Sequence, residues 1–159
     1  MATQELPRLN FSERIDWFLG QRDFSWKLHR FVYRLSGGRL MASKRGIPVM
    51  LLSTTGAVSG KTRTVPVMYM PDGERAILVA SNGGKDTDPA WWRNLRANGL
   101  CDVQAGRKNR LMRARFATAG EREELWPRLV ELNPFWGRYQ SMTGRSIPVV
   151  VLEPATKDA

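Results

Sequence analysis

Residues 54–63 form a short segment rich in groups that bind anions. The run Thr-Thr-Gly-Ala-Val-Ser-Gly-Lys-Thr-Arg holds two glycines, four hydroxyls and two cations. Glycines let backbone N–H groups approach a phosphate, hydroxyls donate further hydrogen bonds, and a lysine and an arginine neutralise its charge. The segment therefore predicts an anion site. An ordinary glycine-serine hairpin loop with solvated charges is the alternative.

The same segment differs from a nucleotide P-loop in spacing and in context. Three residues separate Gly56 from Gly60, whereas the motif GxxxxGK[ST] has four. The residues after Lys61 read as a strand that ends at the turn 71–73, whereas a P-loop is followed by a helix whose N-terminus completes the phosphate site. We therefore expect neither an ATPase nor a GTPase.

The composition indicates one basic domain. Its 159 residues are 42% hydrophobic, enough for a buried core, and 25 Lys and Arg against 15 Asp and Glu give a net charge of +10. Such a surface attracts nucleic acid, anionic lipid or a multiply charged small ligand. Cys101 and His29 are the only residues of their types, which excludes a disulfide framework and predicts no metal site.

The first 45 residues predict a basic helical segment. Residues 22–36 carry apolar side chains at helical spacing beside Lys27, Arg30 and Arg34. This pattern fits peripheral association with the anionic inner face of the cell membrane, and it fits packing of the helix on its own domain at least as well. No apolar run reaches the length of a membrane span and no signal-peptide pattern is present, so we expect a cytoplasmic protein.

The remaining segments predict an α+β fold around a mainly antiparallel sheet closed into a small barrel. Expected strands cover residues 48–53, 65–70, 76–80, 100–104, 110–117 and 147–152. One helix follows Asp88 as its cap and ends at Asn98-Gly99, and a second starts at a Thr118–Glu121 capping box. Residues 133–140 read as an aromatic-rich break. We divide the chain into segment 1–45, barrel domain 46–155 and a disordered tail 156–159.

Four stretches in this order resemble the deazaflavin-dependent nitroreductases of actinobacteria, which use coenzyme F420. They are Leu-Leu-Ser-Thr-Thr-Gly at 51–56 with Ser59-Gly60, Arg63 and Pro66; Val-Ala-Ser-Asn-Gly-Gly at 79–84; Pro-Ala-Trp-Trp at 89–92 with Asn94-Leu95; and Ile-Pro-Val-Val-Val-Leu-Glu-Pro at 147–154. The resemblance covers residues 22–154. It implies a six-stranded, FMN-binding-like split β-barrel that transfers hydride from reduced coenzyme F420 to a quinone, a nitroaromatic or a similar planar acceptor.

The resemblance also implies site residues. A deazaflavin with a phosphate and a glutamyl tail needs a cationic groove for the tail and an apolar slot for the ring. The phosphate and tail would meet Ser59, Gly60, Lys61 and Arg63. The ring would lie against Pro66 and Met68, with its polar edge at the backbone of Val79, Ala80, Ser81 and Asn82, and with Trp91 and Asn94 closing the site. On the acceptor side, Trp136 would stack, and Tyr139, Ser81 or water would supply a proton.

Two departures from the family pattern bear on the substrate. Ala57-Val58 stands where family members commonly carry a cation pair, so Lys61, Arg63 or Lys85 must hold the tail. Tyr139 is the one tyrosine in residues 133–142, where the best-known family member has several, and we therefore favour quinones over bicyclic nitroimidazoles.

Two other kinds of protein remain as alternatives. One is a split barrel that binds FMN or haem. The other is a non-enzymatic basic module, although the cations are scattered rather than placed along one strand face, so we expect no specific nucleic-acid partner. The oligomeric state is left open.

Overall fold

A computed structural model describes residues 31, 33, 43–44 and 46–156 of the chain. In these residues the strands are β1 (Ser43–Lys44), β2 (Ile47–Thr55), β3 (Thr62–Met68), β4 (Met70–Asp72), β5 (Arg75–Val79), β6 (Leu100–Ala105), β7 (Lys108–Phe116) and β8 (Val149–Pro154). The helices are the 3-10 turn η1 (Asn82–Gly84), α3 (Ala90–Asn98), α4 (Ala119–Leu132) and α5 (Pro134–Met142).

The strands form one antiparallel sheet that closes on itself. Its order is β1-β2-β6-β7-β8-β5-β4, and β3 pairs with the other edge of β2. Only Tyr69 separates β3 from β4, so one bent stretch of chain pairs first with β2 and then with β5. When β3 and β4 are counted as one bent strand and the two-residue β1 is set aside, the barrel has the six strands that the sequence predicts.

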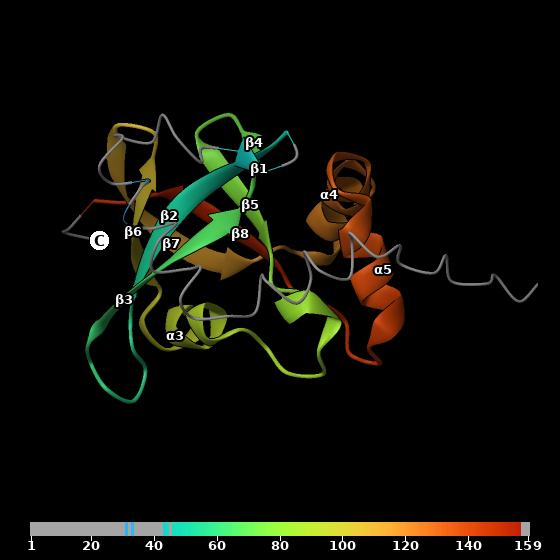
Figure 1. Cartoon of the computed structure of the whole chain (residues 1–159), viewed down its shortest axis with the longest axis horizontal. Coiled ribbons are helices and arrows are strands. Elements are labelled where there is room, and N and C mark those ends of the chain that lie inside the picture. Colours follow the sequence, from blue (N-terminus) through green and yellow to red (C-terminus); the bar gives the residue numbers. More distant parts are fainter. Residues whose placement is uncertain (1–30, 32, 34–42, 45, 157–159) are drawn as a thin grey trace, which may run out of the picture.

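The barrel interior is the first of two cores. Alternate residues of every long strand point inward, as period-two strand geometry requires. Met50, Leu52, Leu78 and Leu152 are fully buried there. Helix α3 packs Trp92 and Leu95 against this cluster, and Figure 1 shows α3 below the sheet beside the β2–β3 loop.

The second core lies on the outer face of β5 and β8. Ile77, Val79 and Val151 point away from the interior cluster and are covered by Leu129 of α4 and Trp136 of α5. Figure 1 shows both helices on one side of the barrel. Because these strands are buried on both faces, they read in the sequence as continuous apolar runs.

Capping residues set several helix ends as expected. The Thr118 hydroxyl accepts a hydrogen bond from the Glu121 backbone, and the Glu121 side chain accepts one from Thr118 N–H, so the predicted capping box is confirmed. Gly99, at φ 69°, ends α3 in the left-handed region as a glycine C-cap. Asp88 is not the cap of α3: Pro89 is, and Asp88 forms ion pairs instead.

The prediction of a break at residues 133–140 was wrong. This segment is helix α5, with Pro134 in its first turn and Asn133 as its cap, whose side-chain oxygen accepts from Phe135 N–H at 3.2 Å. An Asn-Pro pair is a helix-start signal in its own right, since proline lacks the N–H that the first turn cannot use. The aromatic residues obscured that signal.

The basic segment 22–36 lies outside the described residues except for Phe31 and Tyr33, which are both helical. Phe31 is 61% exposed, whereas Tyr33 is fully buried. The Tyr33 hydroxyl donates to Val49 O at 3.1 Å and accepts from Gly106 N–H at 2.9 Å, so Tyr33 itself is fixed to the barrel. No helix in the described part of the chain is long and apolar enough to cross a membrane.

Arg115 joins three elements through one guanidinium group. It makes two bonds to the Glu121 carboxylate, at 2.7 and 2.8 Å, and two to one oxygen of Glu153, at 2.7 and 3.2 Å, which ties β7 to α4 and β8. Hydrogen bonds from Arg115, then from the Thr118 backbone, lower the pKa of Glu121 from its usual 4.5 to about 2.

This pKa shift predicts a loss of stability in acid. Because the folded-state pKa of Glu121 lies below its unfolded value, its contribution is complete above pH 4.5 and is lost as the pH falls toward 2. Glu121→Gln should lower the unfolding free energy at pH 7 and flatten its dependence on pH across that window, measured by urea denaturation. Glu124→Gln is the control, since Glu124 is exposed on the same helix and has no ion pair within the described residues. Equal slopes for wild type and Glu121→Gln would contradict this assignment.

Candidate active site

The antiparallel ladder of the barrel lacks one hydrogen-bonded residue pair, or rung, between β3 and β5. Pairing of β4 with β5 ends at Met70–Ile77, and the next hydrogen-bonded rung of that register would join Met68 to Val79. No such pair forms, because the chain turns at Tyr69 toward β2 and its N–H donates to Pro48 O at 3.1 Å. We call the two unpaired edges, of β3 and of β5, the split.

Backbone groups of both strands face the split. Since Tyr69 bonds to β2, residues 63, 65 and 67 also bond to β2, and the backbone of Pro66 and Met68 points the other way. Proline has no N–H and is therefore suited to an unpaired edge. On β5, Ala80 N–H donates to Pro148 O at 3.0 Å, so the N–H and C=O of Val79 point toward β3.

Side chains of the acceptor and ring groups predicted from the sequence meet on the outer face of the split. Met68 and Val79 pack in the same cluster as Trp136 and Tyr139 of α5. Asn133 lies with its side-chain nitrogen 3.8 Å from the Met68 sulfur. Trp136 is only 4% exposed, so it is part of the core under this face, while Tyr139 is half-buried at its margin.

Three successive backbone N–H groups at the end of β5 have no partner. Ser81 is in the right-handed helical region (φ −71°, ψ −30°) and Asn82 in the left-handed region at φ 50°. This succession turns neighbouring N–H groups to one side and makes a concave donor site for an anion or a carbonyl oxygen. Within the described residues, the N–H groups of Ser81, Asn82 and Gly83 donate to nothing. We call these three groups the N–H nest.

The β2–β3 loop uses most of its own backbone donors. Gly56 N–H donates to Lys61 O at 2.9 Å, Gly60 N–H to Gly56 O at 2.8 Å, and Lys61 N–H to the Ser59 hydroxyl at 3.3 Å. A Cβ at Gly56 would lie 2.5 Å from that hydroxyl, so the turn needs glycine. The predicted backbone cradle is therefore a closed turn, and an anion here would be held by side chains.

Asn94 of α3 fixes this loop. Its side-chain oxygen accepts from Ala57 N–H and its nitrogen donates to the Thr54 hydroxyl, both at 3.0 Å. Asn98, one turn later, donates to Thr55 O at 3.1 Å. Both polar atoms of the Asn94 amide are thus engaged with the loop, which makes Asn94 a positioning residue for it.

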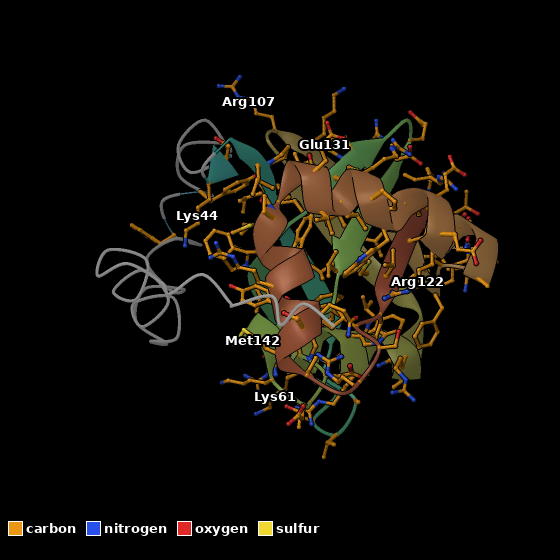
Figure 2. All side chains as sticks on the ribbon, turned by 90° about the vertical axis from the view of Figure 1, so that its right-hand side faces the viewer. Lys44, Lys61, Arg107, Arg122, Glu131 and Met142 are labelled. Carbon is orange, nitrogen blue, oxygen red and sulfur yellow. The ribbon has the colours of Figure 1, made fainter. Side chains whose placement is uncertain are left out.

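Four cations of the β2–β3 loop, β3, the β5–α3 loop and α3 have no ion-pair partner within the described residues. Arg63 is the cross-strand neighbour of Thr54, on the interior-facing side of β3 beside α3. In the part of the chain that the structure describes, no carboxylate lies within 4.0 Å of Lys61, Arg63, Lys85 or Arg93. Figure 2 shows Lys61 at one end of the molecule and Arg107 at the other. Unpaired cations gathered around a donor site favour an anionic ligand.

Arg145, which sequence reasoning missed, contacts the loop between β5 and α3 at four points. Its guanidinium donates to Ala80 O, Ser81 O and Lys85 O at 3.0, 3.1 and 3.0 Å and forms an ion pair with Asp88 at 2.9 Å. All four partners lie about 60 residues earlier in the chain, so no local pattern reveals them. The one available signal was its place just before the matched stretch 147–154.

The remaining predicted site residues, Asn82, Ala80 and Trp91, make contacts within the fold. The Asn82 side chain donates to Thr87 O at 2.9 Å and so holds its own loop, and Ala80 has both backbone groups in use. Trp91 is half-buried against the interior core, and the neighbouring Trp92 is buried with its ring edge-on to Phe116 at 4.7 Å. A cavity of about 180 Å³ at the Tyr69, Glu74 and Arg110 end of the barrel contains none of the predicted site residues.

Metal and thiol chemistry find no support in the described residues. They contain no group of three or more His, Cys, Asp or Glu side chains that could hold an ion. Burial, and to a lesser degree the charge of Asp102, raises the pKa of the Cys101 thiol to about 12. The thiolate is the reactive form, so Cys101 is inert at neutral pH.

Comparison with known proteins gives a consistent result. A family model described as F420H(2)-dependent quinone reductase matches residues 25–154. The F420H(2)-dependent quinone reductase Rv1261c of Mycobacterium tuberculosis is 37% identical over 130 residues, which cover 79% of this chain and 87% of the relative.

Solved structures agree with that match. One titled as an F420-H2 dependent reductase (FDR-A) has 41% identity and a TM-score of 0.62, covering 67% of this chain and 94% of its own. Another, titled as a domain-swapped dimer, has 34% identity and a TM-score of 0.65, covering 88% and 99%.

The position of Asn94 makes a testable prediction. Asn94→Ala removes two hydrogen bonds and should cost about 1–3 kcal/mol of unfolding free energy, since each contributes about 0.5–1.5 kcal/mol. Hydrogen exchange at Ala57 N–H should also speed up. Asn98→Ala is the matched control on the same helix and should leave Ala57 protected. Unchanged exchange in Asn94→Ala would show that the loop is held by other contacts.

Proposed function

The chain belongs to the F420H(2)-dependent quinone reductase family, and we propose that it transfers hydride from reduced coenzyme F420 to a quinone at the split. The observation that carries this placement is the missing rung at Met68 and Val79; in the described residues, three N–H groups that follow β5 also lack acceptors. The family assignment makes the chain a reductase and gives its cofactor. The place of the reaction on the barrel is our proposal.

The residues around the split fit the two parts of coenzyme F420. When bound, this cofactor supplies a hydride from a planar ring, and it carries a phosphate and a carboxylate-bearing tail. Pro66 and Met68 share the outer side of β3, where Pro66 is buried and Met68 packs against the outer core; they would line the ring on that face, and the N–H nest with Val79 N–H would provide donors for its polar edge. Lys61 and Arg63, supported by Lys85 and Arg93, provide the charge that the tail requires.

Ser59 and Gly60 act differently from the two cations. Their turn is closed by internal hydrogen bonds, so they shape the loop that carries Lys61 and Arg63. Asn94 anchors this loop to α3, and Trp91 of the same helix packs against the interior core. These residues therefore hold the tail-binding cations in place.

A quinone fits the acceptor side better than a bulky nitroimidazole. Reduction of a quinone to a hydroquinone takes one hydride and one proton, so the site needs a planar surface and one proton donor. Tyr139 lies at the margin of the outer core next to the Phe135 ring, 6.3 Å between centroids, and it can supply that proton. Ser81, buried at the nest, and water are the other donors. Trp136 forms the apolar floor beneath this surface.

Peripheral membrane association would bring a lipid-soluble quinone to this site. It rests on the basic segment 22–36, of which the structure describes only Phe31 and Tyr33. The exposed ring of Phe31 is available to a lipid surface, while Tyr33 is bonded to the barrel. This association stays a prediction from the sequence.

Changing Lys61 and Arg63 together to Ala should weaken binding of oxidised coenzyme F420 markedly, and should reduce the salt dependence of its Kd, since both cations lose their contact with the tail. Binding can be followed by quenching of the cofactor's fluorescence. Arg107→Ala with Lys108→Ala removes the same charge from the β6–β7 hairpin at the opposite end of the molecule. That control should bind as wild type, and equal weakening in both variants would indicate a diffuse charge effect.

Anaerobic mixing of the protein with reduced coenzyme F420 and a panel of acceptors tests the reaction itself. Reoxidation at the cofactor's absorbance band should be faster with simple quinones than with bicyclic nitroimidazoles. Parallel incubation with FMN, followed by gel filtration, is the cofactor control and should retain no flavin. Retention of FMN in place of the deazaflavin, or reoxidation by nitroimidazoles alone, would overturn the proposal.

A further inference from the structure

The loop between β5 and α3 has a backbone that needs outside support. Asn82, Gly83 and Gly84 take successive positive φ angles of 50°, 65° and 78°. Left-handed backbone is costly for a residue with a side chain, and it persists only where surrounding contacts enforce it. Inside the loop, Gly84 N–H donates to Ser81 O, Lys85 N–H to Asn82 O, and the Asn82 side chain to Thr87 O. These contacts set the turn but do not fix it to the barrel.

The contacts that fix it come from residues 143–145, between α5 and β8. Arg145 bonds to the carbonyls of Ala80, Ser81 and Lys85 and to the Asp88 carboxylate, and only 18% of its side chain is exposed. Two residues earlier, the Thr143 hydroxyl lies 2.6 Å from an Asp86 carboxylate oxygen. Gly84 also packs on Met142 of α5, where a Cβ would approach to 3.2 Å. Residues 142–145 therefore hold the loop at both its start and its end, through Ala80, Ser81 and Asp88 as well as through the residues between them.

The position of the Arg145 bonds matters more than their number. Ser81 O accepts from both Gly84 N–H and Arg145, so the peptide oxygen that closes the turn is the same one that the guanidinium fixes. The N–H groups of Ser81, Asn82 and Gly83 then remain without acceptors among the described residues. Asp88 balances the buried charge of Arg145, and Arg96 of α3 adds a second, more exposed contact to Asp88 at 3.5 Å.

We propose that Arg145 is the positioning residue of the active site: it holds the N–H nest in its ring-binding geometry and links it to the acceptor helix α5. This inference rests on the proposed function, because it takes the nest to be the donor site for the deazaflavin ring. A lysine cannot replace the arginine, since one ammonium group cannot reach three carbonyls and a carboxylate spread over residues 80–88.

The test compares Arg145→Gln and Arg145→Lys with wild type by two measurements. The first is hydrogen exchange at Gly84 and Lys85 in the protein without cofactor, which should become faster in both variants. The second is the Kd for oxidised coenzyme F420. If the freed loop keeps its binding geometry about a tenth of the time, the apparent Kd rises about tenfold. Arg145→Lys, which keeps the positive charge, should not restore the wild-type Kd.

Arg128→Gln is the matched control. It removes an arginine–aspartate pair of similar length, Arg128 to Asp72 at 3.2 Å, on α4. It should lower thermal stability without changing exchange at Gly84 or the Kd. Thermal unfolding of each variant shows whether it folds, and Arg145→Lys keeps the test decisive if Arg145→Gln does not.

Three results would overturn the inference. A wild-type Kd in both Arg145 variants with faster exchange at Gly84 would make Arg145 a structural residue only. Unchanged exchange would show that other contacts hold the loop. Failure of the wild-type protein to bind coenzyme F420 would overturn the proposed site, and this inference with it, which separates that failure from the first two.

Discussion

The bend at Tyr69 is the constraint on which this molecule depends. A strand that continued straight from β3 would pair with β2 along its whole length, and one that continued straight back from β4 would complete the ladder with β5. The chain pairs first with β2 and, after the bend, with β5. The barrel therefore closes, but Met68 and Val79 do not pair. An unpaired edge inside a closed barrel is normally costly, because backbone donors and acceptors need partners. Here the edge carries Pro66, which has no N–H to satisfy.

In the described residues, several paired arginines lie beside α4, and several unpaired cations lie around α3. Arg75, Arg115 and Arg128 on the side of α4 are paired with Asp72, Glu121 and Glu153, and these pairs connect strands to helix. Lys61, Arg63 and Arg93 around α3 and the β2–β3 loop have no such partners. Within the described residues, some cations are therefore paired inside the fold, and others have no carboxylate within 4.0 Å.

Local signals in the sequence predicted much of the fold. The capping box at Thr118 and the glycine after Asn98 act within one helical turn, and the continuous apolar runs of β2, β5 and β8 report strands buried on both faces. The errors were also local. Pro89 takes the cap that Asp88 was expected to provide, because Asp88 is drawn into ion pairs with Arg145 and Arg96. The aromatic content of residues 133–140 concealed the Asn133-Pro134 start of α5, and that helix contributes Trp136 and Tyr139 to the outer core.

The site was less predictable than the fold, for a physical reason. A residue's type shows which bonds it can make, but the partner that takes them is set by chain contacts far apart in sequence. The amide of Asn94 suits a ligand as well as it suits Ala57 and Thr54, and only the packing of α3 against the loop decides between them. Likewise, the glycines of residues 56–60 suggested free N–H groups, yet their tight turn consumes them. The free donors lie instead at residues 81–83, where a right-handed residue precedes left-handed ones. Such a nest persists only when something else satisfies the carbonyls behind it, and the guanidinium of Arg145 does so from the far end of the chain.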